Sequence, residues 1–431
     1  MRSAVRFPSA VQMLAVLVAA VLATALMPAT PASAKTVKID RRLFGLHDSN
    51  PTADSWPAVS PGSIRLWDSD TTWANIEPQQ GAFDWAKLDA IVAAANAKGA
   101  EVTLVLGQTP AWADDPNSLG AGPQYMPRLD AWNNYVATVA SRYKGRIKAY
   151  QVWNEANIVN YWAQNSQNTP AKMAQLTNTA YGVIKSIDPG ALVVGPAFAT
   201  RLSWQRTYLG TFYAQRIGGV PIWKRMDAMS LNLYPLDTGM PETSLKLLKQ
   251  ARKALALRGV PLTKPVWNSE VNYGLATGGS GSSSVISQQR QAAYVLRTYL
   301  LNAAQKVKRV HWYMWDMPAI GNTKMVAADG YTPTLAGKAF GLAQSWMLGG
   351  TMVGPTKSSL PCAKDRNGTY TCVIKYAKGV KRVYWNPTKR VKVTTAKSAT
   401  FMVGVYGKRT AIKGGSKKYV DYRPLMVRSK Y

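Results

Sequence analysis

Eight short apolar runs, separated for the most part by helix-like stretches, constrain the fold of this 431-residue chain more than any other feature. Each run has the length and the β-branched or aromatic residues typical of a strand. The runs lie at residues 43–47, 63–67, 101–107, 147–153, 192–197, 228–234, 264–270 and 309–315. The intervening stretches with the clearest helical periodicity are 83–99, 129–145, 242–259 and 287–306.

Eight strands that alternate with helices over about three hundred residues predict the α/β class and a closed (β/α)8 TIM barrel. The alternative is an open, doubly wound sheet. That fold usually has fewer strands and a glycine-rich first turn, and this sequence has neither feature.

The pattern changes near residue 350. From there to residue 431 the chain has short alternating segments separated by turn residues, which predicts a small antiparallel, β-sandwich-like domain. We therefore expect a barrel over residues 35–349 and a C-terminal β-domain over residues 350–431.

The first 34 residues have the features of a secretory signal. Arg2 and Arg6 precede an apolar stretch, and the small residues Ala32-Ser33-Ala34 form a cleavage site before Lys35. An uncleaved membrane anchor is the alternative. We expect cleavage and a secreted protein, either extracellular or cell-wall associated, with no transmembrane segment in the mature chain.

The two cysteines, Cys362 and Cys372, lie ten positions apart around a segment rich in turn residues. In an exported protein this spacing predicts a hairpin closed by a disulfide bond. Two free thiols are the weaker alternative, and a metal site is weaker still because other ligand types are missing nearby.

Histidine is scarce, since the chain contains only His47 and His311. The sequence also lacks a nucleophile elbow, a zinc-binding HExxH pair, a phosphate-binding loop and a dinucleotide fingerprint. Acid–base chemistry is thus expected to fall to carboxylates and tyrosines, with no metal or cofactor.

Two of the predicted strands deliver a glutamate at their carboxyl ends. Glu155 follows the fourth run in QVWNEAN (151–157), and Glu270 ends the seventh run in KPVWNSE (264–270). Active sites of TIM barrels are built at the carboxyl ends of the strands, so both side chains should face one mouth. The alternative is that each is an ordinary loop residue.

These residues resemble glycoside hydrolase clan A, the retaining (β/α)8 glycosidases, and within it family 39 and related family 5 members. The resemblance covers residues from about 43 to 345. It rests on RLWDSDTTWANIEPQQGAFDWAKLD (65–89), LGQTPAWA (106–113), QVWNEAN (151–157), LNLYP (231–235) and WNSE (267–270).

The resemblance implies Glu155 as the catalytic acid/base, preceded by Asn154, and Glu270 as the nucleophile. Carboxyl groups about 5–5.5 Å apart would favour retention through a covalent glycosyl-enzyme. The chain departs from the clan at Ala156, where members often have proline, and at Gln108, where they often have histidine or asparagine.

Further residues are expected to bind substrate or to position the glutamates. Asn154 is expected to contact the sugar 2-hydroxyl, and Tyr234 and Arg65 to hold Glu270, the arginine by keeping it ionised. The remaining candidates are Trp112 and Trp315 as sugar platforms, His47 and Gln108 as hydroxyl partners, Asp68 and Asp70 after the second strand, and residues 274–284 as a lid. For each of these, a purely structural role is the alternative.

The net charge of the chain is +31, and residues 351–431 alone contain 19 Lys and Arg against 2 Asp, a net charge of +17. Such a charge attracts polyanions, which suggests an anionic cell-envelope polymer as a partner of the C-terminal domain. A solvated surface without a specific partner is the alternative. Nucleic acid is not expected, because no nucleic-acid motif is present.

The sequence therefore predicts an exported retaining glycosidase that acts on a polysaccharide or oligosaccharide. The alternative is a non-catalytic carbohydrate-binding or cell-envelope-binding protein, including an adhesin, on the same scaffold. Two intact glutamates favour the enzyme.

Overall fold

The computed structural model describes residues 36–431 apart from 166–167, 276–284, 317–321 and 357–359. The predicted signal segment and most of the predicted lid loop lie outside the described residues. Within the described part of the chain, no helix is both long and apolar enough to span a bilayer.

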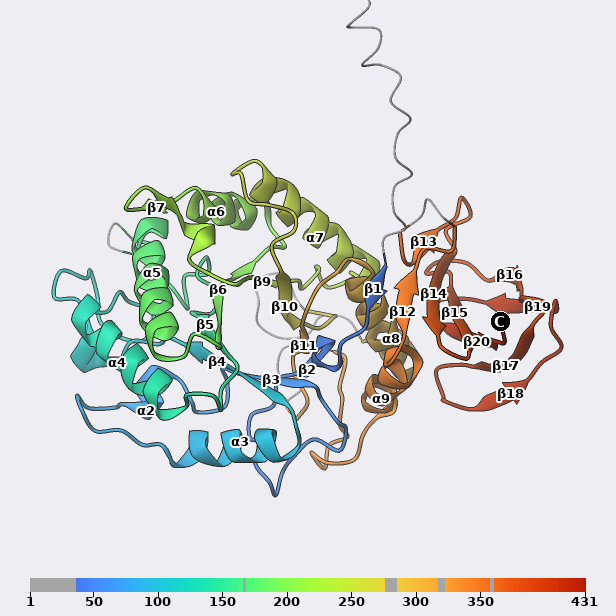
Figure 1. Ribbon diagram of the computed structural model, residues 1–431, viewed down its shortest axis with the longest axis horizontal. Coiled ribbons are helices and arrows are strands. Elements are labelled where there is room, and N and C mark those ends of the chain that lie inside the picture. The colour runs from blue at the N-terminus through green and yellow to red at the C-terminus, as the bar shows by residue number, and fades with distance from the viewer. Residues whose placement is uncertain (1–35, 166–167, 276–284, 317–321, 357–359) are drawn as a thin grey trace, which may run out of the picture.

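Eight parallel strands close into a barrel, which confirms the predicted TIM fold. Each strand coincides with one of the eight predicted apolar runs, although β6 and β10 extend past the predicted ends by two residues and one residue, and in Figure 1 helices surround the ring. The strands are β2 (Phe44–Leu46), β3 (Ser63–Leu66), β4 (Glu101–Leu106), β5 (Ala149–Val152), β6 (Leu192–Ala199), β9 (Ala228–Asn232), β10 (Val266–Val271) and β11 (Val310–Trp312).

All four predicted helical stretches form helices. The described helices are α2 (Trp73–Ile76), α3 (Ala86–Ala97), α4 (Leu129–Arg142), α5 (Pro170–Ile187), α6 (Ser203–Tyr213), α7 (Pro241–Ala256), α8 (Gln288–Ala304) and α9 (Leu335–Met347). Short 3-10 turns occur at Arg41–Leu43, Ala111–Ala113 and Ile222–Lys224, and β7 (Arg216–Ile217) pairs with β8 (Val220–Pro221).

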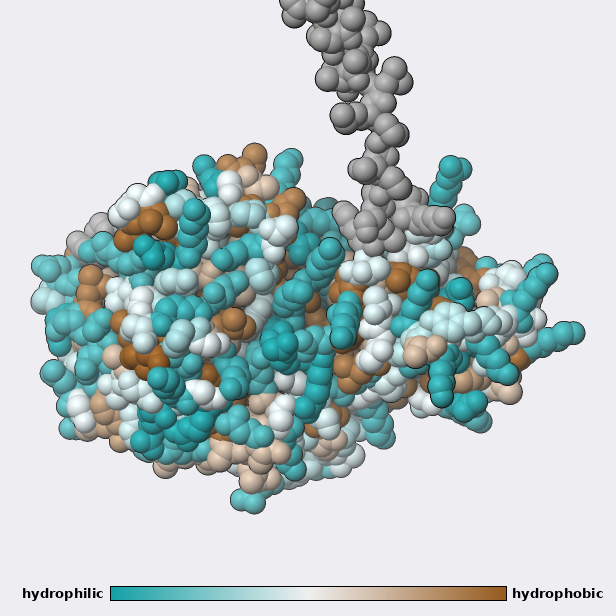
Figure 2. Space-filling view, in the orientation of Figure 1, coloured by the Kyte–Doolittle hydropathy of each residue, from teal (hydrophilic) through white to brown (hydrophobic). Residues whose placement is uncertain are grey.

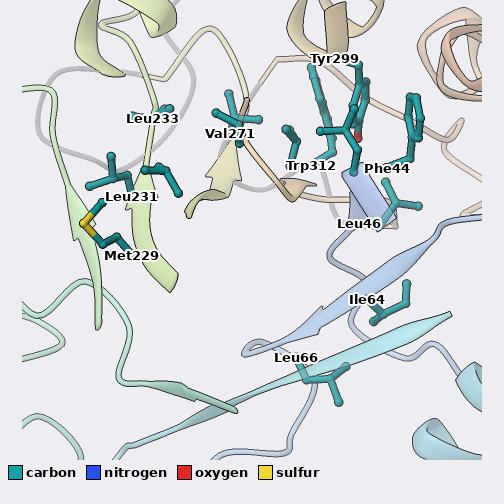
Figure 3. Packing of buried hydrophobic residues seen from close by; sticks show 14 of the residues in the cluster. Phe44, Leu46, Ile64, Leu66, Met229, Leu231, Leu233, Val271, Tyr299 and Trp312 are labelled. Carbon is teal, nitrogen blue, oxygen red and sulfur yellow. The ribbon is translucent and has the colours of Figure 1, made fainter. Parts of the chain in front are cut away.

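The barrel strands have two different faces, because successive side chains of a strand point to opposite sides. Ile64 and Leu66 of β3 belong to the main apolar cluster between the barrel and its helices, where Figure 3 shows them near Phe44 and Leu46 of β2. The intervening residue, Arg65, is fully buried among polar partners inside the barrel. The helices thus pack on an apolar outer face, while the barrel interior around Arg65 is polar.

The C-terminal residues form the predicted antiparallel β-domain, at the right of Figure 1. Its strands are β12 (Thr351–Val353), β13 (Ala363–Lys364), β14 (Tyr370–Tyr376), β15 (Gly379–Trp385), β16 (Val391–Thr394), β17 (Ala399–Val403), β18 (Arg409–Ala411), β19 (Lys417–Val420) and β20 (Leu425–Ser429). β16 and β19 form a separate two-stranded ribbon. The predicted disulfide between Cys362 and Cys372 is present.

One strand of this C-terminal sheet comes from the start of the described chain. β1 (Val37–Lys38) pairs antiparallel with β12, with Val37 opposite Met352. The sequence analysis assigned these residues to the barrel, because a strand of two residues leaves no periodicity to detect. The chain therefore crosses between the two predicted domains twice.

A buried ion pair also joins the β-domain to the barrel. Arg297 of α8 is fully buried and forms an ion pair with Glu242 of α7, its Nε donating to Oε1 at 3.0 Å. Trp385 of β15 donates its indole N–H to the same carboxylate at 2.8 Å. Glu242 is therefore a shared acceptor that ties two barrel helices to the C-terminal sheet.

We expect Glu242→Gln to destabilise the protein by about 3 kcal/mol, because it leaves the buried Arg297 charge without a counterion. The free energy of unfolding, measured by urea denaturation followed by circular dichroism, checks this. Asp130→Asn, at an exposed ion pair with Arg128, is the matched control and should cost less than about 1 kcal/mol. Equal losses in the two variants would contradict this role of Glu242.

Candidate active site

A cavity of about 430 Å³ opens at the carboxyl ends of the barrel strands, and both predicted catalytic glutamates line it. Its lining residues come from segments that follow β3, β5, β6 and β9 and from the ends of β10 and β11. They are Trp67, Asp68, Asn154, Glu155, Ile158, Asn160, Tyr161, Ala199, Thr200, Arg201, Leu202, Trp204, Gln205, Asn232, Tyr234, Glu270, Leu275 and Tyr313.

A larger cavity, of about 600 Å³, lies at the opposite end of the barrel. It is lined by residues near the starts of strands, such as Leu192 and Ala228, and by Asp40, which is ion-paired with Arg42. Catalytic residues of TIM barrels lie at the carboxyl ends of strands, so we assign the active site to the smaller cavity.

A β-bulge in β10 brings Glu270 into the cavity. On β9, Leu231 and Asn232 are consecutive, but on β10 their partners are Asn268 and Glu270, so Ser269 is an extra residue. In a regular strand without the bulge, alternation would place Ser269 inside the barrel and Glu270 on the outer, helix-facing side. The bulge lets both side chains point inward, a re-aiming that bulges beside active sites commonly provide.

The guanidinium of Arg65 connects the two strand ends that carry the glutamates. Its Nη1 donates to Oε1 of Glu270 at 2.8 Å, and its Nη2 donates to Oδ1 of Asn154 at 2.8 Å. Its Nε donates to Oε1 of Gln151 at 2.6 Å. Because the planar fork fixes three acceptors at once, it sets the position of Glu270 relative to the segment that carries Glu155.

The two glutamates have different hydrogen-bond partners. Glu270 accepts at both oxygens, from Arg65 and from the Tyr234 hydroxyl at 3.1 Å. Glu155 accepts at Oε1 from the Asn232 amide at 3.0 Å, and its Oε2 forms no hydrogen bond with any other described residue. This difference favours charge on Glu270 and a proton on Glu155.

A chain of hydrogen bonds inside the barrel runs from Gln151, which accepts from the guanidinium, to Glu155. The Gln151 amide donates to Ser230 at 2.8 Å, Ser230 donates to Ser269 at 2.6 Å, and Ser269 donates to Oδ1 of Asn232 at 2.6 Å. The Asn232 amide then donates to Glu155. Because the Asn232 amide oxygen accepts from Ser269, the amide nitrogen of Asn232 is the end that faces Glu155 and donates to it.

Burial raises the pKa of both glutamates, and the neighbouring carboxylates raise it further. Arg65 lowers the pKa of Glu270, but burial outweighs this effect and raises the pKa to about 8, so the arginine alone does not keep this carboxyl ionised in the way the sequence analysis expected. Two carboxyl groups coupled in this way share one proton over a broad pH range.

Asp68 is a third carboxyl group in the cavity. It accepts from the Tyr313 hydroxyl at 2.8 Å, and partial loss of solvent around the carboxyl in the cavity raises its pKa, although the residue as a whole is exposed. Its negative charge contributes to the raised pKa of both Glu155 and Glu270. Asp70, the other candidate after the second strand, is exposed and lies near Lys87.

The structure places some predicted substrate-binding residues beside the cavity and not at its surface. His47 is buried, and its Nε2 lies 2.9 Å from the Ser269 carbonyl oxygen, which can only accept. Burial, together with the Arg65 charge, lowers the pKa of His47, so it is neutral. It therefore supports the bulged strand and does not itself line the cavity.

Three other predictions of sugar contact are not supported by the positions of the residues. Trp112 donates its indole N–H to the Glu77 carbonyl at 2.9 Å and packs against Trp73. Trp315 is buried, and the backbone of Gln108 accepts from Ala74. Each packs within the rim of the barrel, outside the cavity lining.

The sequence analysis missed several residues that line the cavity. Asn232 and Tyr313 were detectable, since each lies an even number of positions from another inward-facing residue of its strand. Trp204, which is 46% exposed, and Arg201, which donates to the Pro235 carbonyl at 2.7 Å, lie on and before α6. No local pattern distinguishes these two from ordinary surface residues.

Comparison with known proteins identifies the class to which this fold and cavity are similar. Residues 67–192, which include Asn154 and Glu155, match the model of Glycosyl hydrolase family 10. Endo-1,4-beta-xylanase 3 of Hypocrea jecorina is 26% identical over 160 residues, which is 35% of this chain and 44% of the xylanase. The chain thus matches less than half of the length of this curated relative.

Solved structures share the fold over most of the chain. A family 39 glycoside hydrolase from Bacteroides cellulosilyticus has a TM-score of 0.65 at 16% identity, covering 91% of this chain and 82% of that one. A β-xylosidase of family 39 from Caulobacter crescentus has a TM-score of 0.63 at 15% identity, covering 93% and 98%. A family 30 endoxylanase from Clostridium papyrosolvens has a TM-score of 0.58 at 15% identity, covering 93% and 98%. The predicted resemblance to the (β/α)8 glycosidases of clan A is confirmed.

We expect Asp68→Asn to lower the pKa of both Glu155 and Glu270. A negative neighbour disfavours loss of a proton, so its removal favours the carboxylate and shifts both titrations to lower pH. The shift is measured by NMR titration of the protein with carboxyl-labelled glutamate. Asp70→Asn removes an exposed charge from the same segment and should leave both titrations unchanged; a shift of the same size there would argue against a specific role of Asp68.

Proposed function

We propose that this chain is an exported retaining glycoside hydrolase that cleaves O-glycosidic bonds of a polysaccharide or oligosaccharide by double displacement. The observation that carries the proposal is the pair Glu155 and Glu270, which end two barrel strands and line one cavity. Their unequal hydrogen-bond partners support unequal roles, with Glu270 as nucleophile and Glu155 as acid/base.

In the first step, a carboxylate oxygen of Glu270 bonds to the anomeric carbon while the bond to the leaving-group oxygen breaks. Glu155 gives its proton to that oxygen. In the second step, Glu155 takes a proton from water, the water oxygen bonds to the anomeric carbon, and the bond to Glu270 breaks. After the first step Glu155 is a carboxylate and Glu270 is an ester of the sugar, and the second step returns the proton to Glu155 and the carboxylate to Glu270.

The partners of the two glutamates have separate tasks in this reaction. Arg65 and Tyr234 hold the attacking oxygens in place, and burial raises the pKa of Tyr234, so its hydroxyl remains a donor. Asn154 accepts from Arg65 through Oδ1, which leaves its amide N–H groups to donate to the sugar. A hydroxyl beside the anomeric carbon is the expected acceptor.

The substrate class is inferred from the relatives and the cavity. Most of the similar proteins whose names state an activity are xylanases or β-xylosidases, and a glucosidase and an arabinofuranosidase are also among them. We therefore choose β-linked xylosyl polymers as the first substrates to test. Trp204 at the cavity wall offers a partly exposed aromatic face for a sugar ring. Export is supported by the N-terminal signal pattern and by the disulfide.

A non-catalytic carbohydrate-binding protein remains the second candidate, because the same cavity can bind hydroxyl groups without reaction. The charge of the C-terminal domain supports a role in binding an anionic envelope polymer, either beside catalysis or in place of it.

The nucleophile is tested with activated 2-fluoro glycosides, which are expected to leave a covalent adduct on Glu270 that peptide mass spectrometry locates. Glu270→Gln should lower kcat by at least about a thousandfold and take up no label. An adduct on another residue, or near wild-type turnover by the variant, would refute the assignment.

The acid/base role predicts a dependence on the leaving group. Glu155→Gln should lower kcat by about 10²–10⁴-fold for substrates with poor leaving groups, and much less for dinitrophenyl glycosides, which need no proton. The ratio of kcat/KM for the two substrate types measures the effect. Gln205→Ala, which changes another lining residue, is the control and should lower both rates equally. Equal losses of kcat/KM for the two substrate types in Glu155→Gln would contradict the acid/base role of Glu155.

A further inference from the structure

A long part of the C-terminal domain carries positive charge only. Residues 366–420 contain 14 Lys and Arg and neither Asp nor Glu. Nine of these cations lie between Lys389 and Lys418, in and around β16, β18 and β19, which Figure 1 shows at the end of the domain remote from the barrel. Figure 2 shows hydrophilic side chains projecting from that end of the molecule. The charge is therefore gathered on one part of the molecular surface.

The β16–β19 ribbon organises part of this charge. Lys392 lies opposite Tyr419, and Thr394 lies opposite Lys417, so alternation puts these residues on one face. Arg390 precedes β16 by one residue and lies 4.1 Å from the Tyr419 ring centroid, with the Lys392 ammonium at 5.2 Å. We call Arg390, Lys392 and Lys417 the cationic ribbon.

The charge of the cationic ribbon is not neutralised within the described chain. All three side chains are exposed, and none forms an ion pair with another described residue. The nearby carboxylate of Asp421 is already paired with Arg423. The positive charge of the ribbon can thus attract an anionic ligand from solution.

A hollow of about 190 Å³ lies beside the ribbon, lined in part by Tyr406, Tyr419 and the ion pair of Asp421 with Arg423. Tyr406 is 60% exposed and Tyr419 is 53% exposed. The Tyr419 ring is engaged by the cations of the ribbon, whereas Tyr406 presents an aromatic face of the kind that packs on the apolar side of a sugar ring. Cations and an aromatic face together match a sugar that carries a carboxylate.

We propose that the cationic ribbon and the adjoining hollow bind an acidic polysaccharide, a polymer of uronate type. The inference rests on the proposed function, because a glycosidase barrel on the same chain would gain from holding a glycan nearby. A nucleic acid fits less well, since bases need free aromatic faces in series and cations engage the ring of Tyr419.

The test uses the full chain, because β1 and Glu242 tie the C-terminal domain to the barrel. The variant Arg390→Gln/Lys392→Gln/Lys417→Gln removes the ribbon charge. The matched control, Lys246→Gln/Lys249→Gln/Lys253→Gln, removes three exposed charges from α7. Circular dichroism melting checks folding, and Lys392→Gln/Lys417→Gln replaces the triple variant if that protein unfolds.

The probe is immobilised polygalacturonate, with its methyl-esterified, neutral form as the reference polymer. We expect the wild type to bind the acidic form at least about tenfold more tightly than the neutral form. The ribbon variant should lose at least about tenfold in Kd for the acidic polymer and show a shallower dependence on salt. The α7 control should stay within about twofold of the wild type.

Equal binding of the two polymers, or equal losses in the ribbon variant and the α7 control, would overturn the proposal. Tighter ribbon-dependent binding to duplex DNA would assign the surface to nucleic acid instead. Turnover of a small aryl glycoside separates the two proposals, since the ribbon variant should keep wild-type kcat/KM. If no sugar labels Glu270 while ribbon-dependent binding persists, the proposed reaction fails and the binding surface stands.

Discussion

The buried charge of Arg65 is the constraint on which the barrel mouth depends. An arginine without access to water requires acceptors in fixed directions, since an unpaired buried charge costs several kcal/mol. Glu270, Asn154 and Gln151 supply those acceptors at 2.6–2.8 Å. The same contacts that solvate the guanidinium fix the attacking carboxylate and the asparagine beside the acid/base. The contacts that stabilise the polar interior of the barrel are therefore the same contacts that set the geometry of the site.

The polar chain from Gln151 to Asn232 extends this order to the second glutamate. Hydroxyl groups of Ser230 and Ser269 can donate or accept, but the amides at the two ends determine the direction. The side chains belong to β5, β9 and β10 of a closed barrel, whose strands have little freedom to move apart. The strands therefore hold the partners of both glutamates in place, while Glu155 itself lies in the segment that follows β5.

The sequence was sufficient for the fold and for placing both glutamates at the same end of the barrel, but not for the inward direction of Glu270. Eight apolar runs predict eight strands, and a carboxylate at the end of a parallel strand must lie at the common mouth. The bulge at Ser269 was not predictable, since strict alternation would have placed Glu270 outside the barrel.

Other predictions failed for a different reason. Trp112 and Trp315 were chosen because large aromatic residues bind sugars, but large aromatic residues also fill cores, and residue type does not distinguish the two uses. Trp204 lines the cavity from the start of α6, where only tertiary packing brings it to the site. Residues from loops and helix ends are the part of an active site that a single sequence describes least well.

The pairing of β1 with β12 has a consequence for the order of assembly. The first described strand finds its partner only after the whole barrel has been synthesised, so the C-terminal sheet cannot be completed early. Until β12 has been made, Val37 and Lys38 have no strand partner, so they stay unpaired while the barrel strands form. The pairing of β1 with β12 would then be a late step that fixes the start of the described chain against the C-terminal sheet.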